Sequence, residues 1–272
     1  MADLLPLKGK TAVVTGAASG IGRAIAVSLA RRGCDLALAD VNEVGLKEVQ
    51  AELTGLVEVS RHRLDVSDRE AVAAFPATVL ARHSGVDVLV NNAGVALGGQ
   101  FDQVPAADFE WLFGINFWGV VNMTRAFLPL LKASPEARLV NISSLFGLIA
   151  PPGQAAYCAS KFAVRGFSES LRHELKPTRV GVTVVHPGGV ATSIARNARM
   201  PATPDPAQAE KAVRSVEAML KLPPAAAGEI IVKGIERRRP RVLVGNDAKF
   251  LATLERLAPV SYWKWLGPRL RR

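Results

Sequence analysis

The chain has 272 residues, of which 49% are hydrophobic and 21% charged, and its formal net charge is +10. That length and composition suit one large, well-packed α/β domain and exclude a repeat or low-complexity protein. The two cysteines, Cys34 and Cys158, are too isolated for a disulfide framework or a zinc site and favour a reducing compartment. Because the sequence shows no signal-peptide pattern and no membrane-spanning run, we expect a cytoplasmic protein. His173 and His186 are not spaced as ligands with any Cys or Asp, so we expect no metal.

Apolar runs with the spacing of strands alternate with runs that have the spacing of helices. Near-continuous valine, leucine and alanine strands between helices are typical of a parallel sheet that is covered on both faces. The sequence therefore predicts a Rossmann-type α/β fold, a doubly wound parallel sheet in three layers, as a single domain over residues 1–272. We expect strands at Thr11–Val14, Asp35–Ala39, Val57–Leu64, Val86–Val90, Arg138–Ile142, Gly181–Val185 and Arg241–Val244. We expect helices at Ile21–Arg32, from Asn42 to Leu53, after a capping box at Ser67–Glu70, at Ala106–Ala133, at 154–176, after Pro224 and at the C-terminus.

The alternation breaks between residues 188 and 222, where prolines are frequent. Asp205 followed by Pro206 is typical of a helix N-cap with proline at the first helical position. Apolar residues follow at helical spacing, at Ala209, Val213, Val216 and Leu220. We therefore expect a short helix that closes over the substrate as a lid.

A glycine-rich turn follows the first strand and opens the first helix. Glycine lets the backbone turn sharply and approach a pyrophosphate, which the N–H groups of a helix N-terminus bind. The spacing is G-x-x-x-G-x-G rather than G-x-G-x-x-G, so it shares only the physics of the general dinucleotide fingerprint, and a tight turn that binds nothing is the alternative. The residues expected to contact the cofactor here are Gly16, Ser19, Gly20, Ile21 and Gly22.

Asp40 ends the second strand, eighteen residues after Gly22. A carboxylate at this position accepts hydrogen bonds from a ribose 2′-hydroxyl and repels a 2′-phosphate. Arg23 and Arg32 are the nearby basic residues, and the neighbouring Val41 is neutral. The pattern favours NAD over NADP, and a carboxylate that merely ends the strand is the alternative.

Tyr157 and Lys161 stand four residues apart in a predicted helix, so their side chains share one face. A cation beside a phenol favours the phenolate, and we expect Lys161 to lower the Tyr157 pKa so that the side chain exchanges protons with an alcohol or carbonyl near neutral pH. The same spacing occurs in helices that only display a solvated pair. The glycine-rich turn and Ser144, thirteen residues upstream of Tyr157, favour the catalytic interpretation.

The ordered set of motifs resembles the short-chain dehydrogenase/reductase family, single-domain type, over nearly the whole chain. The motifs are T-G-x-x-x-G-I-G at 15–22, Asp65-Val66, Asn91-Asn92-Ala93-Gly94, Asn116, Ser143-Ser144, Tyr157-x-x-x-Lys161 and Pro187-Gly188-Gly189-Val190-Ala191-Thr192. No motif position departs from the family pattern.

The resemblance implies a catalytic tetrad. Tyr157 would exchange the proton, Ser144 rather than Ser143 would hold the substrate oxygen, Lys161 would bond the nicotinamide ribose, and Asn116 would anchor a water that links Lys161 to solvent. It also implies that Asp65 and Val66 contact the adenine. The other cofactor-binding positions that it implies are Asn92, Ala93, Gly94, Tyr157, Lys161, Pro187, Gly188, Val190 and Thr192.

The resemblance implies an NAD-dependent oxidoreductase that moves a hydride between nicotinamide and a secondary alcohol or ketone. We expect Ser144, Phe146, Gln154 and Tyr157 to contact the substrate. The surrounding apolar residues favour a steroid-, retinoid- or long-chain-like compound, although Arg196 and Arg199 leave an anion open. Non-redox lyase or epimerase chemistry and a non-catalytic nucleotide-binding module are the alternatives.

Positive charge gathers near the C-terminus, where residues 229–272 hold eleven Lys or Arg and four Asp or Glu. These cations border a late helix and a tail, so we expect no nucleic-acid partner. Residues 247–272 mix aromatic and basic side chains, which suits a peripheral membrane contact, or else a helix that packs on the domain or on a second subunit. The resemblance also implies a homodimer or homotetramer formed through helices 106–133 and 154–176.

Overall fold

The strands of the chain form one parallel sheet in the order β3-β2-β1-β4-β5-β6-β7, as a computed structural model describing residues 4–201, 214 and 216–270 shows. The strands are β1 Thr11–Thr15, β2 Asp35–Asp40, β3 Val59–Arg63, β4 Val88–Asn91, β5 Ala137–Ile142, β6 Val180–Pro187 and β7 Arg241–Val244. The helices are α1 Gly20–Ala30, α2 Glu43–Leu53, α3 Arg69–Leu80, α4 Ala106–Phe113, α5 Gly119–Ala133, α6 Ala155–Glu174, α8 Pro224–Glu236, α9 Asn246–Leu257 and α10 Tyr262–Leu270, with short turns η1 Gly114–Trp118 and η2 Leu145–Gly147. The predicted doubly wound parallel sheet is confirmed.

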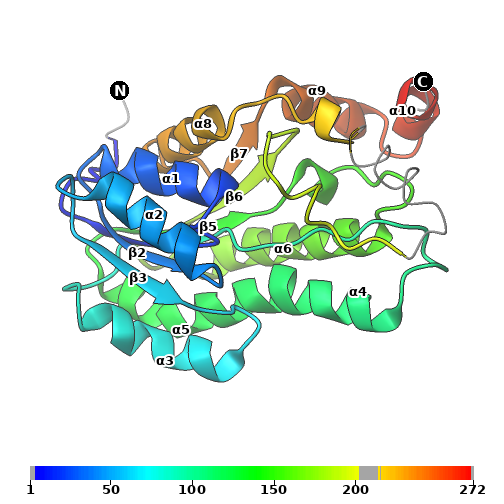
Figure 1. Cartoon of the computed structure of the whole chain (residues 1–272). Helices are drawn as coiled ribbons and strands as arrows, with labels where there is room; N and C mark the ends of the chain where they lie inside the picture. The colour runs from blue at the N-terminus through cyan, green and yellow to red at the C-terminus, as the bar shows by residue number, and fades with distance from the viewer. Residues whose placement is uncertain (1–3, 202–213, 215, 271–272) are drawn as a thin grey trace.

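Helices cover both faces of the sheet (Figure 1), with α1, α2 and α8 on one side and α3, α5 and α6 on the other. Successive side chains of a strand point to opposite faces, which is why a strand covered on both sides is apolar throughout. In β1, Val14 packs with Leu29 of α1 and Ile231 of α8. Its neighbour Val13 packs with Phe127 of α5 on the other face. Both valines are fully buried, and this is the physical basis of the three layers.

Of two predicted helix caps, one is confirmed and one is wrong. Asn42 caps α2 as expected, accepting a hydrogen bond from the Gly45 N–H at 3.1 Å. The capping box at Ser67–Glu70 is wrong, because Asp68 is the N-cap of α3 and its carboxylate accepts from the N–H groups of Glu70 and Ala71. Ser67 instead donates its hydroxyl to Asp65 at 2.7 Å. A short acidic side chain one residue later competes for the same orphan N–H groups and takes the cap.

The predicted helix over Ala106–Ala133 is interrupted by one π-helical turn, η1. Such turns insert an extra residue into an α-helix and frequently occur at functional sites. Asn116 lies in this turn and is fully buried.

Two bridges hold the described parts of the segment 188–222: one joins its two ends to each other, and the other joins it to the loop after β4. Val190 forms a parallel bridge with Leu222, and Arg199 forms one with Leu97. The proposed lid cap at Asp205 and Pro206, with Ala209 and Val213, lies outside the described residues. The lid therefore stays a prediction.

Candidate active site

The predicted site residues gather at the carboxyl ends of the strands, beside the point where the strand order reverses between β1 and β4. In open parallel sheets the crevice outside this point is where ligands bind. Because the strands are parallel, the sheet places at this edge the residues that follow β1, β2, β4, β5 and β6.

The glycine-rich turn is tightly constrained. Gly16 and Gly20 have φ values of +64° and +55°, a backbone region in which glycine is favoured. A Cβ added at Gly22 would overlap the carbonyl oxygen of Gly16 and lie 2.5 Å from the Nδ2 of Asn92. Ser19 is the N-cap of α1, and its side chain makes no capping hydrogen bond with the described residues. The first N–H groups of α1 are therefore left to bind an anion.

Thr15 and Asn92 connect this turn to the end of β4. The Thr15 hydroxyl accepts from the N–H groups of Asn92 and Ala93, both at 3.0 Å. The Asn92 amide donates back to the carbonyls of Thr15 and Gly16 at 2.9 and 3.1 Å. Asn92, expected to line the cofactor, thus also holds the turn in shape, and Thr15 is a supporting residue that our sequence analysis missed.

Asp40 is held beside the glycine-rich turn by two backbone groups. Its carboxylate accepts from the N–H groups of Ala18 and Asn42, each at 3.0 Å. The basic residues considered at the sequence level are engaged elsewhere: Arg23 pairs with Glu52 at 2.8 Å, and Arg32 pairs with Glu229 at 2.8 Å.

The sequence analysis overlooked another cation near Asp40. Arg63 is the register partner of Asp40 on β3, and it forms an exposed ion pair with Glu43 at 3.7 Å. An exposed pair of this length is weak. Arg63 is therefore a cation that can offset the negative charge of Asp40 where the adenosine ribose would bind.

Ser144, Tyr157 and Lys161 meet where β5 ends and α6 begins. Ser144 is the N-cap of η2, and a hydrogen bond joins it to Tyr157. The Lys161 Nζ lies 5.6 Å from the Tyr157 ring centroid and donates to the carbonyl of Ile142 at 3.2 Å. Ser143 points elsewhere and donates to the backbone carbonyl of Lys161 at 2.8 Å. The structure thus brings three of the four tetrad residues together and distinguishes the two serines.

The charge states of this group differ from our expectation. Burial raises the pKa of Tyr157 to about 12, although the hydrogen bond with Ser144 acts in the opposite direction. Burial lowers the pKa of Lys161 to about 8. The prediction that the Tyr157 pKa is lowered is therefore wrong for this structure, because burial favours the neutral phenol more than the hydrogen bond with Ser144 favours the phenolate. The phenol keeps its proton at neutral pH, which is the form that donates to a carbonyl oxygen.

Asn116 connects two of the segments that form the site. Its Oδ1 accepts from the Val95 N–H at 2.8 Å, and its Nδ2 donates to the Val95 carbonyl at 3.0 Å and to the Ser160 hydroxyl at 3.2 Å. A Cβ added at Gly94 would lie 3.2 Å from the Asn116 Oδ1 and 3.3 Å from the Lys161 Nζ. Asn116 therefore joins the segment after β4 to the helix that carries Tyr157, and a side chain at Gly94 would press on both Asn116 and Lys161.

The remaining cofactor positions form the two flanks of the crevice. On one flank Asp65 is exposed and accepts from the Ser67 N–H at 2.9 Å, while Val66 packs closely against Gly119. On the other flank β6 ends at Pro187, and a Cβ at Gly20 would lie 3.1 Å from the Cγ2 of Thr192. The segment Gly188–Thr192 thus reaches the glycine-rich turn.

Asp247 fixes this second flank from a distant part of the sequence. Its carboxylate accepts from the Gly189 N–H at 2.6 Å, and a side chain at Gly188 would overlap it. Asp247 lies in the first turn of α9, fifty-eight residues after Gly189, and no motif pointed to it.

The substrate side is mostly apolar. The Phe146 ring meets the Tyr157 ring edge-on at 6.1 Å between centroids. A Cβ at Gly98 would lie 3.3 Å from the Gln154 Nε2 and 2.7 Å from the Met200 Sδ, so both side chains border that loop.

Both arginines that left an anionic substrate open have carboxylate partners. Arg196 pairs with Glu217 at 3.0 Å. Arg199 pairs with Asp108 at 2.6 Å and stacks on the Trp111 ring at 3.6 Å. Each guanidinium therefore already faces a carboxylate, and the Arg196 side chain is largely exposed.

His186 is a further buried group behind the site. Its Nδ1 donates to the Ser144 carbonyl at 2.9 Å, and its Nε2 is buried with no partner among the described residues. Burial lowers its pKa to about 4, so the ring is neutral at physiological pH. It is a positioning group for Ser144 that our sequence analysis left aside.

This burial predicts a pH dependence of stability. Because the folded pKa of His186 is about 4 and the ordinary value is 6.5, the unfolded chain binds more protons between these values. The free energy of unfolding should therefore rise by up to about 3 kcal/mol from this residue as pH increases through that window. The variant His186→Asn keeps a donor for the Ser144 carbonyl. Its free energy of unfolding, measured by urea titration at each pH from 4 to 7, should rise less steeply with pH than that of the wild type. Equal slopes would mean that His186 does not carry the effect.

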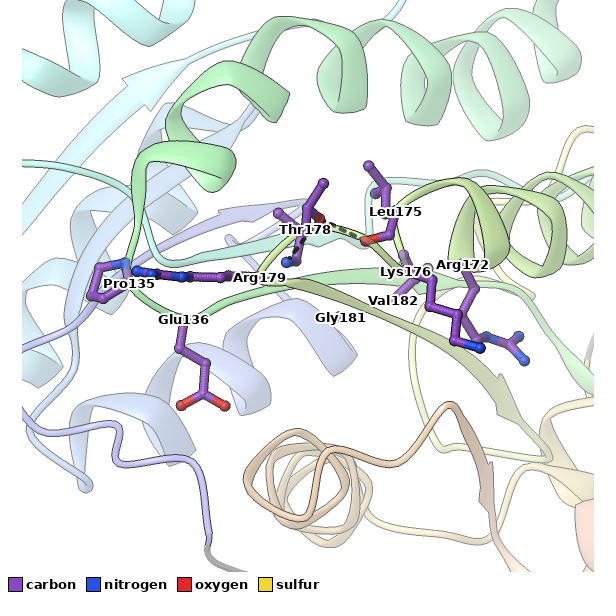
Figure 2. Close-up of a pocket in the computed structure, with 10 residues that line it drawn as sticks. Pro135, Glu136, Arg172, Leu175, Lys176, Thr178, Arg179, Gly181 and Val182 are labelled. Carbon is purple, nitrogen blue, oxygen red and sulfur yellow. Dashed lines mark hydrogen bonds between the residues drawn. The ribbon is translucent and has the colours of Figure 1, made fainter.

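A hollow of about 520 Å³ lies at the opposite, amino end of the strands, lined by the residues before β5 and at the start of β6 (Figure 2). Arg179 extends toward Pro135, whereas Arg172 and Lys176 point away from it. The three cations do not converge, and none of the predicted site residues lies there. This hollow is therefore separate from the crevice described above.

Comparisons with known proteins agree with this geometry. The family model described as short chain dehydrogenase matches residues 10–202. SadH of Mycobacterium tuberculosis is 46% identical over 259 residues, covering 94% of this chain and 93% of that protein.

Solved structures give the same result. A short chain dehydrogenase/reductase from Burkholderia phymatum in complex with NAD has a TM-score of 0.87 at 33% identity, covering 94% of this chain and 96% of that one. An alcohol dehydrogenase from Thermococcus sibiricus complexed with 5-hydroxy-NADP has a TM-score of 0.66 at 32% identity, covering 79% and 92%. With the family model matching most of its length and a relative aligned almost end to end, the chain belongs to the short-chain dehydrogenase/reductase family of oxidoreductases.

Proposed function

We propose that this protein transfers a hydride between NAD(H) and a secondary alcohol or ketone with an apolar body. The observation that carries the proposal is the meeting of Ser144, Tyr157 and Lys161 at the carboxyl ends of the strands, with Asn116 buried beneath them. A hydroxyl, a phenol and an ammonium at one point are suited to proton exchange at a carbinol oxygen. The crevice beside them has the features of a dinucleotide site.

The chain offers a fit for the cofactor. The positive-φ glycines, the uncapped start of α1 and the absent side chain at Gly94 leave space and N–H donors where a pyrophosphate and a nicotinamide ribose would lie. Gly16, Ser19, Gly20, Ile21 and Gly22 would hold the pyrophosphate, and Asp40 the adenosine ribose. Asp65 and Val66 would flank the adenine, and Val190 and Thr192 the carboxamide. Bound nicotinamide supplies the hydride acceptor or donor.

The chain's own groups handle the proton. Ser144 and Tyr157 both bond the substrate oxygen, which orients the carbinol carbon. Tyr157 gives its proton to that oxygen in reduction and takes it back in oxidation. Lys161, beside the ring, stabilises the phenolate when it forms, and the Asn116 side chain holds the loop after β4 against α6.

Asp40 should determine the choice of cofactor. Asp40→Ala removes a carboxylate that would bond the ribose hydroxyls, and a charged hydrogen bond contributes about 1.5–3 kcal/mol. The preference for NAD over NADP in kcat/KM should fall at least about tenfold, as measured with both cofactors. Asp35→Ala, at the opposite end of the same strand, is the matched control and should leave the preference unchanged. A wild type that prefers NADP would show that Arg63 reaches the phosphate.

The apolar surroundings of Tyr157 support a steroid-, retinoid- or long-chain-like substrate. The ion pairs of Arg196 and Arg199 support the same conclusion, because each guanidinium already has a carboxylate partner within the chain. We test the function by following reduced nicotinamide absorbance with NAD and a panel of secondary alcohols of increasing chain length. No turnover in either direction with an intact Tyr157 would favour lyase, epimerase or binding-only alternatives, which the complete tetrad argues against.

We also propose a homodimer or homotetramer in the cytoplasm. A groove of about 390 Å³ between α5 and α6 is lined by Val121, Leu128, Phe167 and Leu171 among others, and Trp118 and Phe162 nearby are exposed. A second copy would cover these apolar side chains. Both cysteines are free and buried, which suits a reducing compartment.

A further inference from the structure

The outer side of α9 and α10 is an exposed apolar and basic surface. Its large apolar side chains are Phe250, Leu257, Val260 and Trp265, which are 64%, 79%, 91% and 60% exposed. Between them stand Lys249, Arg256 and Lys264, all exposed. We call these seven residues the C-terminal face. Figure 1 shows α9 and α10 together at one end of the molecule.

The helix spacing separates this face from a packed inner side. Residues 249, 250, 253, 256 and 257 of α9 are exposed and recur at intervals of three and four, so they lie on one side of the helix. On the inner side, Leu251, Ala252 and Tyr262 pack against Leu145, Leu148 and Ile149. The Tyr262 hydroxyl accepts from the Ala150 N–H at 2.9 Å. The tail therefore packs on the domain and presents a second side that is exposed in the described part of the chain.

The charges around this face have one sign. The two acidic residues of α9 are turned to other partners, because Asp247 bonds Gly189 and Glu255 interacts with Arg241. The sequence adds Arg269, Arg271 and Arg272 beyond it. Exposed aromatic and aliphatic side chains among cations suit the interface of an anionic bilayer, where the rings enter the headgroup region and each cation adds attraction.

We propose that the C-terminal face docks the protein on an anionic membrane surface. None of the described helices is long and apolar enough to cross a membrane, so the contact would be peripheral. The inner side of the same helices touches the 145–149 segment, whose Phe146 meets the Tyr157 ring. Docking would thus place the substrate side of the site next to the bilayer. Delivery of substrate from the membrane to this site rests on the proposed function, in which the substrate is apolar.

Co-sedimentation with vesicles tests the proposal. The wild-type chain should sediment with phosphatidylserine/phosphatidylcholine vesicles at low salt, sediment much less with phosphatidylcholine alone, and be released in high salt because exposed charges are screened. The double variant Lys249→Glu/Leu257→Glu should bind the anionic vesicles at least about tenfold more weakly, since it loses a surface cation and an exposed aliphatic side chain that would enter the headgroup region.

The chain offers a control with the same substitutions. Lys47 and Leu56 are exposed on the other side of the domain, in and after α2, so Lys47→Glu/Leu56→Glu changes the net charge equally. This control should bind as the wild type does, and thermal unfolding should show that both variants are folded. A wild type that stays in the supernatant at low salt, or two variants that weaken binding equally, would overturn the proposal.

Light scattering tests whether a second copy of the chain, and not a membrane, covers the C-terminal face. If the Lys249→Glu/Leu257→Glu variant has a smaller molar mass than the wild type and neither binds vesicles, a second copy covers the face and the proposal is wrong. Turnover of a water-soluble secondary alcohol by the wild type without vesicles tests the proposed function separately. Failure to bind vesicles would therefore not contradict the proposed function, and absence of turnover would not contradict membrane binding.

Discussion

Replacing Tyr157 with phenylalanine should lower kcat by at least about a hundredfold, the usual size of a general acid–base contribution. The ring and its packing against Phe146 remain, while the hydroxyl that bonds Ser144 and exchanges the proton is lost. Binding of NAD, measured by fluorescence or calorimetry, should change little, because the substitution removes no charge from the crevice.

The second tyrosine is a matched control for this variant. The chain has two tyrosines, and Tyr262→Phe makes the same chemical change where the hydroxyl only accepts a hydrogen bond from Ala150. It should reduce stability by about 1 kcal/mol and leave kcat within a few-fold of the wild type. Near-normal turnover of Tyr157→Phe would exclude Tyr157 as the proton-exchanging group.

Gly22→Ala should disable the cofactor site. The added methyl group would overlap the Gly16 carbonyl and press on the Asn92 amide, so the turn has to open and the bonds from Asn92 to Thr15 and Gly16 weaken. Overpacking of this kind destabilises by about 1–3 kcal/mol. The dissociation constant for NAD should rise at least about tenfold, a change that corresponds to about 1.4 kcal/mol.

Gly85→Ala serves as the control for that substitution. A Cβ at Gly85 has no heavy atom within 4 Å and its φ is not positive, so alanine fits there. This variant should keep NAD affinity and match or exceed the wild-type melting temperature. If Gly22→Ala also kept its affinity, the glycine-rich turn would not be the pyrophosphate site.

Local pattern predicted most of the scaffold. A strand was predicted near each observed one, and the central strands β4 and β5 were the clearest, because burial on both faces leaves little choice of residue. The glycine-rich turn and the Tyr157–Lys161 spacing were also readable, since each depends on neighbours in the chain. The cap of α3 was misassigned because Ser67 and Asp68 compete for the same N–H groups.

What the sequence analysis missed depends on contacts between distant segments. The Tyr157 pKa was predicted to fall and instead rises, because the pattern showed the nearby cation but not the burial. Asp247 bonds Gly189 from fifty-eight residues away, and no spacing rule connects them. The bonds from Asn116 to Val95 and Ser160 likewise became visible only when three segments were folded together.

The π-helical turn at Gly114–Trp118 has a consequence for the register of the long helix around it. Each residue of an α-helix rotates the following side chains by about 100°, so one extra residue shifts the angular phase of everything after it. Phe127 and Leu131 are fully buried in α5 with this phase. If the same residues were wound as regular α-helix, the side chains after the turn would rotate by about 100°, and Phe127 and Leu131 would turn away from the sheet. The wide turn takes up the extra residue and keeps both of them buried.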